Sequence, residues 1–154
     1  MATSMRLLRS EIHPDYIRIE EIINIFVSLG YARFSIQDET DVYILTIAMP
    51  IIDDELVNSE NLKKSTIIYI DLIENDEEMF YCPKTCKKYY SYLFFENVSS
   101  RERIILDFLH RYFELYQDDI FWDCDKFFYT KKYIDKIYSK TYDPNWLYIS
   151  PDSF

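Results

Sequence analysis

The sequence contains a single glycine among its 154 residues, together with only five prolines, three cysteines and two histidines. Folds that hold phosphates with a glycine-rich loop, and hydrolases with a glycine-flanked nucleophilic serine, therefore do not fit this chain. No apolar run approaches the roughly eighteen residues of a membrane span. The first ten residues also lack the apolar core and cleavage site of a signal peptide. These features predict a cytoplasmic protein that does not associate with a membrane.

Cysteine and histidine are too sparse to indicate a metal site or a catalytic pair. Cys82 and Cys86 are separated by three residues, whereas common zinc and redox motifs have two. Cys124 and His110 are distant from this pair in sequence, and no local signature links them to it. We therefore predict free thiols, as in a reducing compartment, with no metal ion and no cofactor. No role is assigned to the cysteines.

Aromatic and acidic side chains are, by contrast, abundant. The chain carries 15 Tyr, 11 Phe and 2 Trp, and its net charge is −10. Nearly half of the residues are apolar, so the chain can bury a core, and its length fits a single domain spanning residues 1–154. The surplus negative charge disfavours binding to nucleic acid and suits a basic protein as a partner.

Hydrophobic periodicity predicts two main helices and a short third one. The first covers residues 16–29, begins at Asp15 as its cap and ends at Gly30. The second covers residues 99–116 and opens with a capping box formed by Ser99 and Glu102. Its apolar stripe consists of Ile105, Phe108, Leu109, Tyr112 and Tyr116. The short helix is predicted over residues 130–140.

Apolar segments with alternating or β-branched residues predict the strands. These segments are residues 31–37, 42–49, 66–73, 79–81, 89–95 and 146–149, with polar connections at 38–41, 53–65 and 74–78. Residues 5–12 are expected to be an edge strand or a frayed start. This order predicts an α+β fold: an antiparallel sheet of about four to six strands, two main helices packed on one face and a short C-terminal helix.

Residues 118–125, which we call the acidic bend, combine four carboxylates with aromatic side chains. Tyrosine and tryptophan often anchor protein interfaces, and surrounding acids can steer a basic partner. The bend lacks the glycine and the closing glutamate of a calcium loop. We predict a partner-binding surface and no catalytic residue. Its six predicted docking residues are Asp118, Asp119, Phe121, Trp122, Asp123 and Asp125.

A small acidic α+β protein, rich in Tyr and Phe and without a catalytic motif or export signal, resembles the immunity proteins of bacterial polymorphic and contact-dependent toxin systems. The resemblance covers the overall character of the chain and rests on no specific motif, so it assigns no residue a role. It implies a cytoplasmic, non-enzymatic inhibitor that binds one cognate toxin domain, often a basic nuclease, and occludes its active site.

Two alternatives stay open at this point. One is a metal-dependent hydrolase or nuclease that uses the carboxylates of Asp71 and Glu74, although the lysine expected on an adjacent strand is missing. Calorimetric titration with a divalent ion distinguishes such an enzyme from a binding protein. The other alternative is an acidic nucleic-acid mimic, which would compete with DNA for a basic protein. The sequence does not determine the oligomeric state or the identity of the partner.

Overall fold

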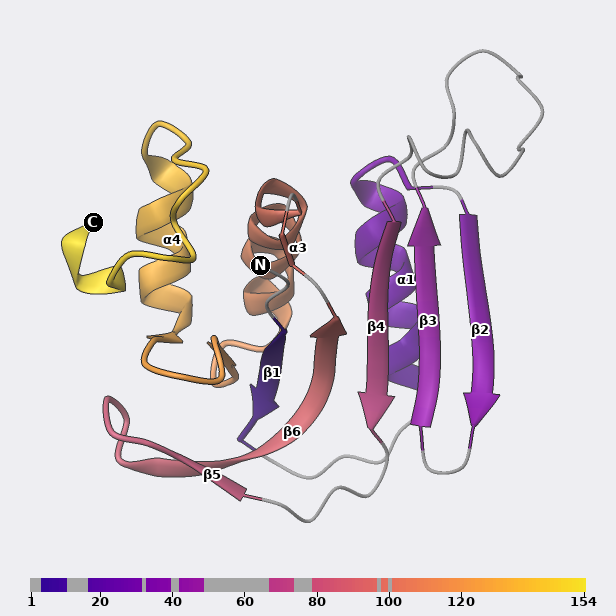
Figure 1. The fold of residues 1–154 in the computed structure, drawn as a ribbon, viewed down its shortest axis with the longest axis horizontal. Helices are drawn as coiled ribbons and strands as arrows, with labels where there is room; N and C mark the ends of the chain where they lie inside the picture. Colours follow the sequence, from indigo (N-terminus) through magenta and orange to yellow (C-terminus); the bar gives the residue numbers. More distant parts are fainter. Residues whose placement is uncertain are drawn as a thin grey trace.

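The computed structural model describes residues 4–10, 17–31, 33–39, 42–48, 67–73, 79–96, 98–99 and 101–154. Within these ranges the chain forms strands and helices in a mixed order (Figure 1). The strands are β1 (Met5–Arg9), β2 (Arg33–Glu39), β3 (Val42–Ala48), β4 (Ile67–Ile73), β5 (Met79–Cys82), β6 (Lys87–Glu96), β7 (Ile120–Trp122) and β8 (Phe128–Tyr129). The helices are α1 (Ile17–Ser28), α3 (Glu102–Leu115), α4 (Lys131–Ser139) and the short 3-10 helix η1 (Pro151–Ser153). None of these helices is long and apolar enough to cross a membrane.

All described strands belong to one antiparallel sheet. Its order is β2-β3-β4-β6-β1-β7-β8, and β5 pairs with β6 outside this path. Five strands of five to ten residues form the body of the sheet, whereas β5, β7 and β8 have only two to four residues each. The predicted α+β class is thus confirmed, with an antiparallel sheet, two main helices and a short helix near the C-terminus.

The first strand lies inside the sheet, which contradicts its predicted place at an edge. β1 pairs with β6 on one side and with β7 on the other. The prediction was wrong because β7 comes from the acidic bend, for which the sequence analysis predicted no strand. Three residues of that bend extend far enough to give β1 a second neighbour.

The helices and one face of the sheet enclose the main core through a series of aromatic contacts. The rings of Phe26 on α1 and Phe108 on α3 are stacked with centroids 4.7 Å apart. Phe108 in turn contacts Phe95 of β6, and Phe95 contacts Phe121 of β7, each edge to face at 5.7 Å. Figure 1 shows α1 behind β3 and β4, and α3 near β1. Aromatic burial therefore holds both main helices against the sheet.

A second, smaller core lies on the opposite face of the sheet, where the curvature of β6 lets the β5–β6 hairpin cover part of that face. In β1, Leu7 pairs with Leu93 and Leu8 with Ser91, so Tyr92 is an extra residue that bulges β6. The long curve of β6 is visible in Figure 1. It brings the β5–β6 hairpin over β7 and β8. There the buried residues Leu8, Cys82, Tyr89, Ile120 and Phe128 pack together with Phe80 and Trp122.

Helix α3 confirms the predicted apolar stripe but not the predicted capping box. Ile105, Phe108, Leu109 and Tyr112 are buried, and Tyr116 packs at the edge of the core. The helix begins at Glu102, and its N-cap, Arg101, makes no side-chain capping bond. Ser99 lies in the preceding turn. The carboxylate of Glu102 accepts a hydrogen bond from the Tyr148 hydroxyl at 2.9 Å.

Helix α1 ends as the sequence predicts. Gly30 has a φ of 97° and its N–H donates to the carbonyl of Val27, while the N–H of Tyr31 donates to the carbonyl of Phe26. This pair of bonds is the Schellman motif, which needs a residue with positive φ after the helix. The rings of Phe26 and Tyr31 meet edge to face at 5.5 Å and add the apolar contact that often accompanies it. The predicted cap Asp15 lies outside the described residues.

The C-terminal region differs from the prediction in one element. Helix α4 agrees with the predicted helix to within one residue at each end. Residues 146–149, predicted as a strand, instead form a turn that packs on α3, because the indole N–H of Trp146 donates to the carbonyl of Glu102 at 3.0 Å. Residues 40–41 and the predicted connections 53–65 and 74–78 lie outside the described residues.

Buried tyrosines should make the fold sensitive to alkali. Burial raises the pKa of Tyr31, Tyr112 and Tyr129, with nearby carboxylates as the second cause in each case. Above about pH 10 an unfolded tyrosine loses its proton while the folded one keeps it. The unfolded state then binds fewer protons, so the free energy of unfolding falls by about 1.4 kcal/mol per pH unit for each such group. Below about pH 10 each tyrosine is protonated in both the folded and the unfolded state, so its raised pKa does not change the free energy of unfolding.

Urea denaturation between about pH 9 and about pH 11 measures this decline. Tyr31→Phe is the informative variant, because the Tyr31 hydroxyl has no hydrogen-bond partner among the described residues. Its stability should match that of the parent near neutral pH and decline less steeply above about pH 10. If the free energy of unfolding fell equally steeply with pH in the parent and in the variant, the raised pKa of Tyr31 would be contradicted.

Candidate functional site

The acidic bend is positioned between the end of α3 and the start of α4. After α3 the chain turns, enters β7, passes through a loop at residues 123–127 and returns as β8. Side chains alternate along the strand. Phe121 therefore faces the main core with the helices, whereas Ile120 and Trp122 face the second core.

Two of the six predicted docking residues are interior. Phe121 is fully buried and Asp119 is only 6% exposed. The Oδ2 atom of Asp119 accepts a hydrogen bond from the Tyr112 hydroxyl at 2.7 Å, and its Oδ1 accepts one from the N–H of Ser10 at 3.2 Å. These two side chains stabilise the fold and do not face a partner. The docking interpretation is therefore restricted to the other four residues.

Asp119 belongs to a buried polar cluster beneath β1. Arg9 is 3% exposed and its guanidinium lies over the ring of Tyr92, 3.1 Å from the ring centroid. Burial raises the pKa of Tyr112 well above its usual value, the charge of Asp119 raises it further, and the charge of Arg9 opposes both. The cluster thus places a cation, a carboxylate and two tyrosines in an otherwise apolar interior. Burial of such groups is costly unless hydrogen bonds or opposite charges compensate for it, and here the Tyr112 hydroxyl and the N–H of Ser10 both donate to the carboxylate of Asp119.

The other four predicted docking residues reach the surface to different degrees. Asp118 and Asp125 are exposed, while Trp122 and Asp123 are half-buried. Asp123 shapes the loop, because its Oδ1 accepts hydrogen bonds from the N–H groups of Asp125 and Phe127, both at 2.9 Å. The carboxylates of Asp118 and Asp125 make no hydrogen bond or ion pair with any described residue. They are therefore the two carboxylates of the bend that no described residue engages.

Trp122 joins the bend to the neighbouring hairpin. Its ring contacts Phe80 of β5 at 5.1 Å and stacks on Phe128 of β8 at 5.6 Å. Arg6 lies beside this cluster, with its guanidinium over the rings of Phe80 and Phe94. The indole is thereby held in one orientation, which gives the surface of the bend a rigid aromatic side.

An open hollow of about 530 Å³ adjoins the bend where α3 gives way to α4. Two carboxylates, two lysines, an amide and a hydroxyl line it: Asp118, Asp135, Lys131, Lys132, Gln117 and Thr130. Sequence analysis identified Asp118 but not the other five. No sequence signal marks them, because they come together only when α4 folds back beside α3.

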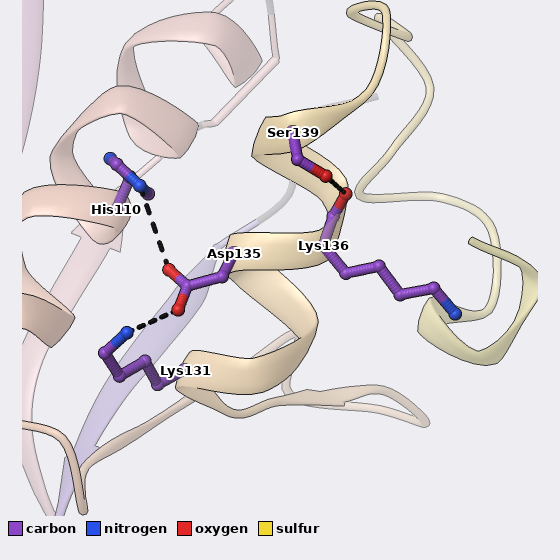
Figure 2. A network of polar contacts seen from close by, with 5 residues as sticks. All are labelled: His110, Lys131, Asp135, Lys136 and Ser139. Atoms are coloured by element: carbon purple, nitrogen blue, oxygen red, sulfur yellow. Dashed lines mark hydrogen bonds and ion pairs between the residues drawn. The ribbon is translucent and has the colours of Figure 1, made fainter.

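Figure 2 shows how Asp135 at this hollow is held from both sides. Its Oδ2 forms an ion pair with Lys131 on the same helix, and its Oδ1 lies 3.8 Å from Nε2 of His110 on α3. The imidazole of His110 stacks on the ring of Tyr138, with centroids 3.8 Å apart and planes 5° from parallel. Ser139 donates its hydroxyl proton to the carbonyl of Lys136 on its own helix. The contacts of His110 with Asp135 and Tyr138 therefore join α3 to α4 at the edge of the hollow.

The cysteines are free and lie in three different environments. Cys82 is buried, Cys124 is partly buried and Cys86 is exposed. The N–H of Cys86 donates to the carbonyl of Cys82 within the hairpin turn. No group of three or more potential metal-ligating side chains occurs among the residues described above. The two carboxylates of the alternative hydrolase site are not among these residues, because the structure does not describe Glu74 or the side chain of Asp71.

No protein-family model, curated protein or solved structure matches this chain.

Proposed function

We propose that this protein is a non-enzymatic binding protein of the immunity-protein kind, which neutralises a basic toxin domain by docking the acidic bend against it. The observation that carries this proposal is the pair of exposed carboxylates, Asp118 and Asp125, which flank the half-buried Trp122 and make no ion pair with any described residue. Together they offer two attachment points for lysine or arginine beside a rigid ring.

The overall charge supports the same partner chemistry. With a net charge of −10, the chain attracts a basic protein over long range, which raises the association rate at low salt. The hollow next to Asp118 adds space for a side chain of the partner. Occlusion of the toxin's active site by this docking is what the resemblance to immunity proteins implies.

The proposal predicts that reversing both exposed charges of the bend removes protection. The toxin to be tested is the protein encoded by the neighbouring gene, because immunity genes usually lie beside their toxins. The parent protein should restore growth to cells that produce this toxin, and the double variant D118K/D125K should not. In surface plasmon resonance, the association rate of the parent should fall steeply with added salt, and the affinity of the variant should be at least about tenfold lower.

The matched control is E20K/E96K, which changes the net charge equally at two exposed positions on α1 and β6. It should bind almost as tightly as the parent. Equal losses in the two double variants would show that only the total charge matters. Failure of the parent protein to protect the cells would contradict the proposed function itself.

A further inference from the structure

The outer face of the β5–β6 hairpin is an exposed surface that the proposed function does not use. Met79 and Tyr81 are 46% and 56% exposed, and they alternate with Phe80 and Cys82, whose side chains belong to the second core. The register pairs Met79 with Tyr90 and Tyr81 with Lys88, so these four side chains lie side by side. We call Met79, Tyr81, Lys88 and Tyr90 the hairpin face.

The charge of this hairpin is opposite to that of the rest of the chain. The paired part of the hairpin, residues 79–90, contains three lysines and no carboxylate, so it carries +3, and the remainder of the chain carries −13 to give the net −10. Lys84 is engaged by Asp152 at 3.6 Å and by the ring of Tyr133. Lys87 and Lys88 are exposed and make no hydrogen bond or ion pair with any described residue. The hairpin face is therefore cationic and aromatic.

The acidic bend has the complementary chemistry, but the hairpin face of the same molecule cannot reach it. The inner side of the hairpin packs on the strands of the bend, as the contact between Phe80 and Trp122 shows. Because side chains alternate along β5, Met79 and Tyr81 point away from these strands. A contact between the two surfaces must therefore join different molecules.

We infer that the hairpin face of one copy docks on the acidic bend of a second copy, with Lys88 facing Asp118 and Asp125. Lys87 lies at the end of β6 beside this face and adds to its positive charge. The inference is independent of the proposed function, although both involve the acidic bend. A single-stranded nucleic acid fits less well, because phosphate binding depends on several cations. Only two lysines of the hairpin lack an ion pair with the described part of the chain, and the remainder of the chain carries −13. If the contact forms reciprocally, it closes a two-fold dimer, and otherwise it extends a chain of molecules.

Sedimentation equilibrium of the purified full chain, over a range of protein concentrations, tests this inference. At low salt the parent should associate, and added sodium chloride should weaken the association. Both K87E/K88E and D118K/D125K should raise the apparent dissociation constant at least about tenfold. Mixing the two variants should restore association, because every contact in the mixed complex again joins opposite charges. Circular dichroism confirms that the variants are folded.

The matched control is K136E/K140E, which makes the same charge change at exposed positions on and just after α4. It should associate like the parent. A parent that stays monomeric at low salt, or variants that fail to associate when mixed, would overturn the inference. So would a monomeric parent that binds a fluorescent single-stranded oligonucleotide through Lys87 and Lys88. K87E/K88E should still protect cells from the toxin. Failure of the proposed self-association is therefore distinguishable from failure of the proposed function, which would appear as loss of protection by the parent.

Discussion

Replacing Asp119 with alanine is expected to lower the free energy of unfolding by about 3 kcal/mol or more, because it removes the acceptor at the centre of the buried polar cluster. The Tyr112 hydroxyl and the N–H of Ser10 would each lose a hydrogen bond to the carboxylate. A buried donor without a partner costs about 1–3 kcal/mol. The buried guanidinium of Arg9 would also lose a carboxylate from its surroundings.

The measurement is a urea or thermal denaturation of Asp119→Ala and of Asp118→Ala, its exposed neighbour. For a chain of this length, about 3 kcal/mol corresponds to a decrease in Tm of roughly 6–12 °C. Asp118→Ala should stay within about 0.5 kcal/mol of the parent, since its side chain is exposed and unbonded. Asp119→Asn keeps an acceptor for Tyr112 and should be destabilised less than the alanine variant. Equal stabilities for Asp118→Ala and Asp119→Ala would refute the role assigned to Asp119.

Replacing Phe108 with alanine is expected to cost about 3–5 kcal/mol, because the ring lies where both main helices meet the sheet. Phe108 is fully buried and contacts the rings of Phe26, Phe95 and Tyr112. Its removal leaves a cavity bordered by three elements that cannot close on it without shifting a helix. Domains have a total stability of about 5–15 kcal/mol, so this single change approaches the point of unfolding.

Leu115→Ala on the same helix is the control for Phe108→Ala. Leu115 is 59% exposed, so its truncation should change the stability by about 0.5 kcal/mol or less. Denaturation monitored by near-ultraviolet circular dichroism is suitable, because the aromatic series around Phe108 should lose its signal with the fold. If the two variants lost a comparable amount of stability, the ring contacts of Phe108 would contribute little to the stability of the fold.

Local signals in the sequence determined most of the secondary structure. The apolar stripe of α3 and the positive φ of Gly30 at the end of α1 follow from short-range patterns, and both are confirmed. Such patterns are informative because helix periodicity and left-handed caps depend on residues only a few positions apart. Composition likewise determined the net charge, on which the expectation of a basic partner rests.

Only the tertiary structure decided which residues of the acidic bend are accessible. Asp118 and Asp119 are adjacent and chemically identical, yet one is exposed and the other is held in the core by Tyr112 and Ser10. The partners of Asp119 lie 7 and 109 residues away along the chain, so no local pattern reveals both of them. The interior place of β1 and the hollow beside α4 depend in the same way on strands and helices that meet only after folding. Sequence patterns report the preferences of neighbouring residues, whereas burial and exposure are set by contacts between distant segments.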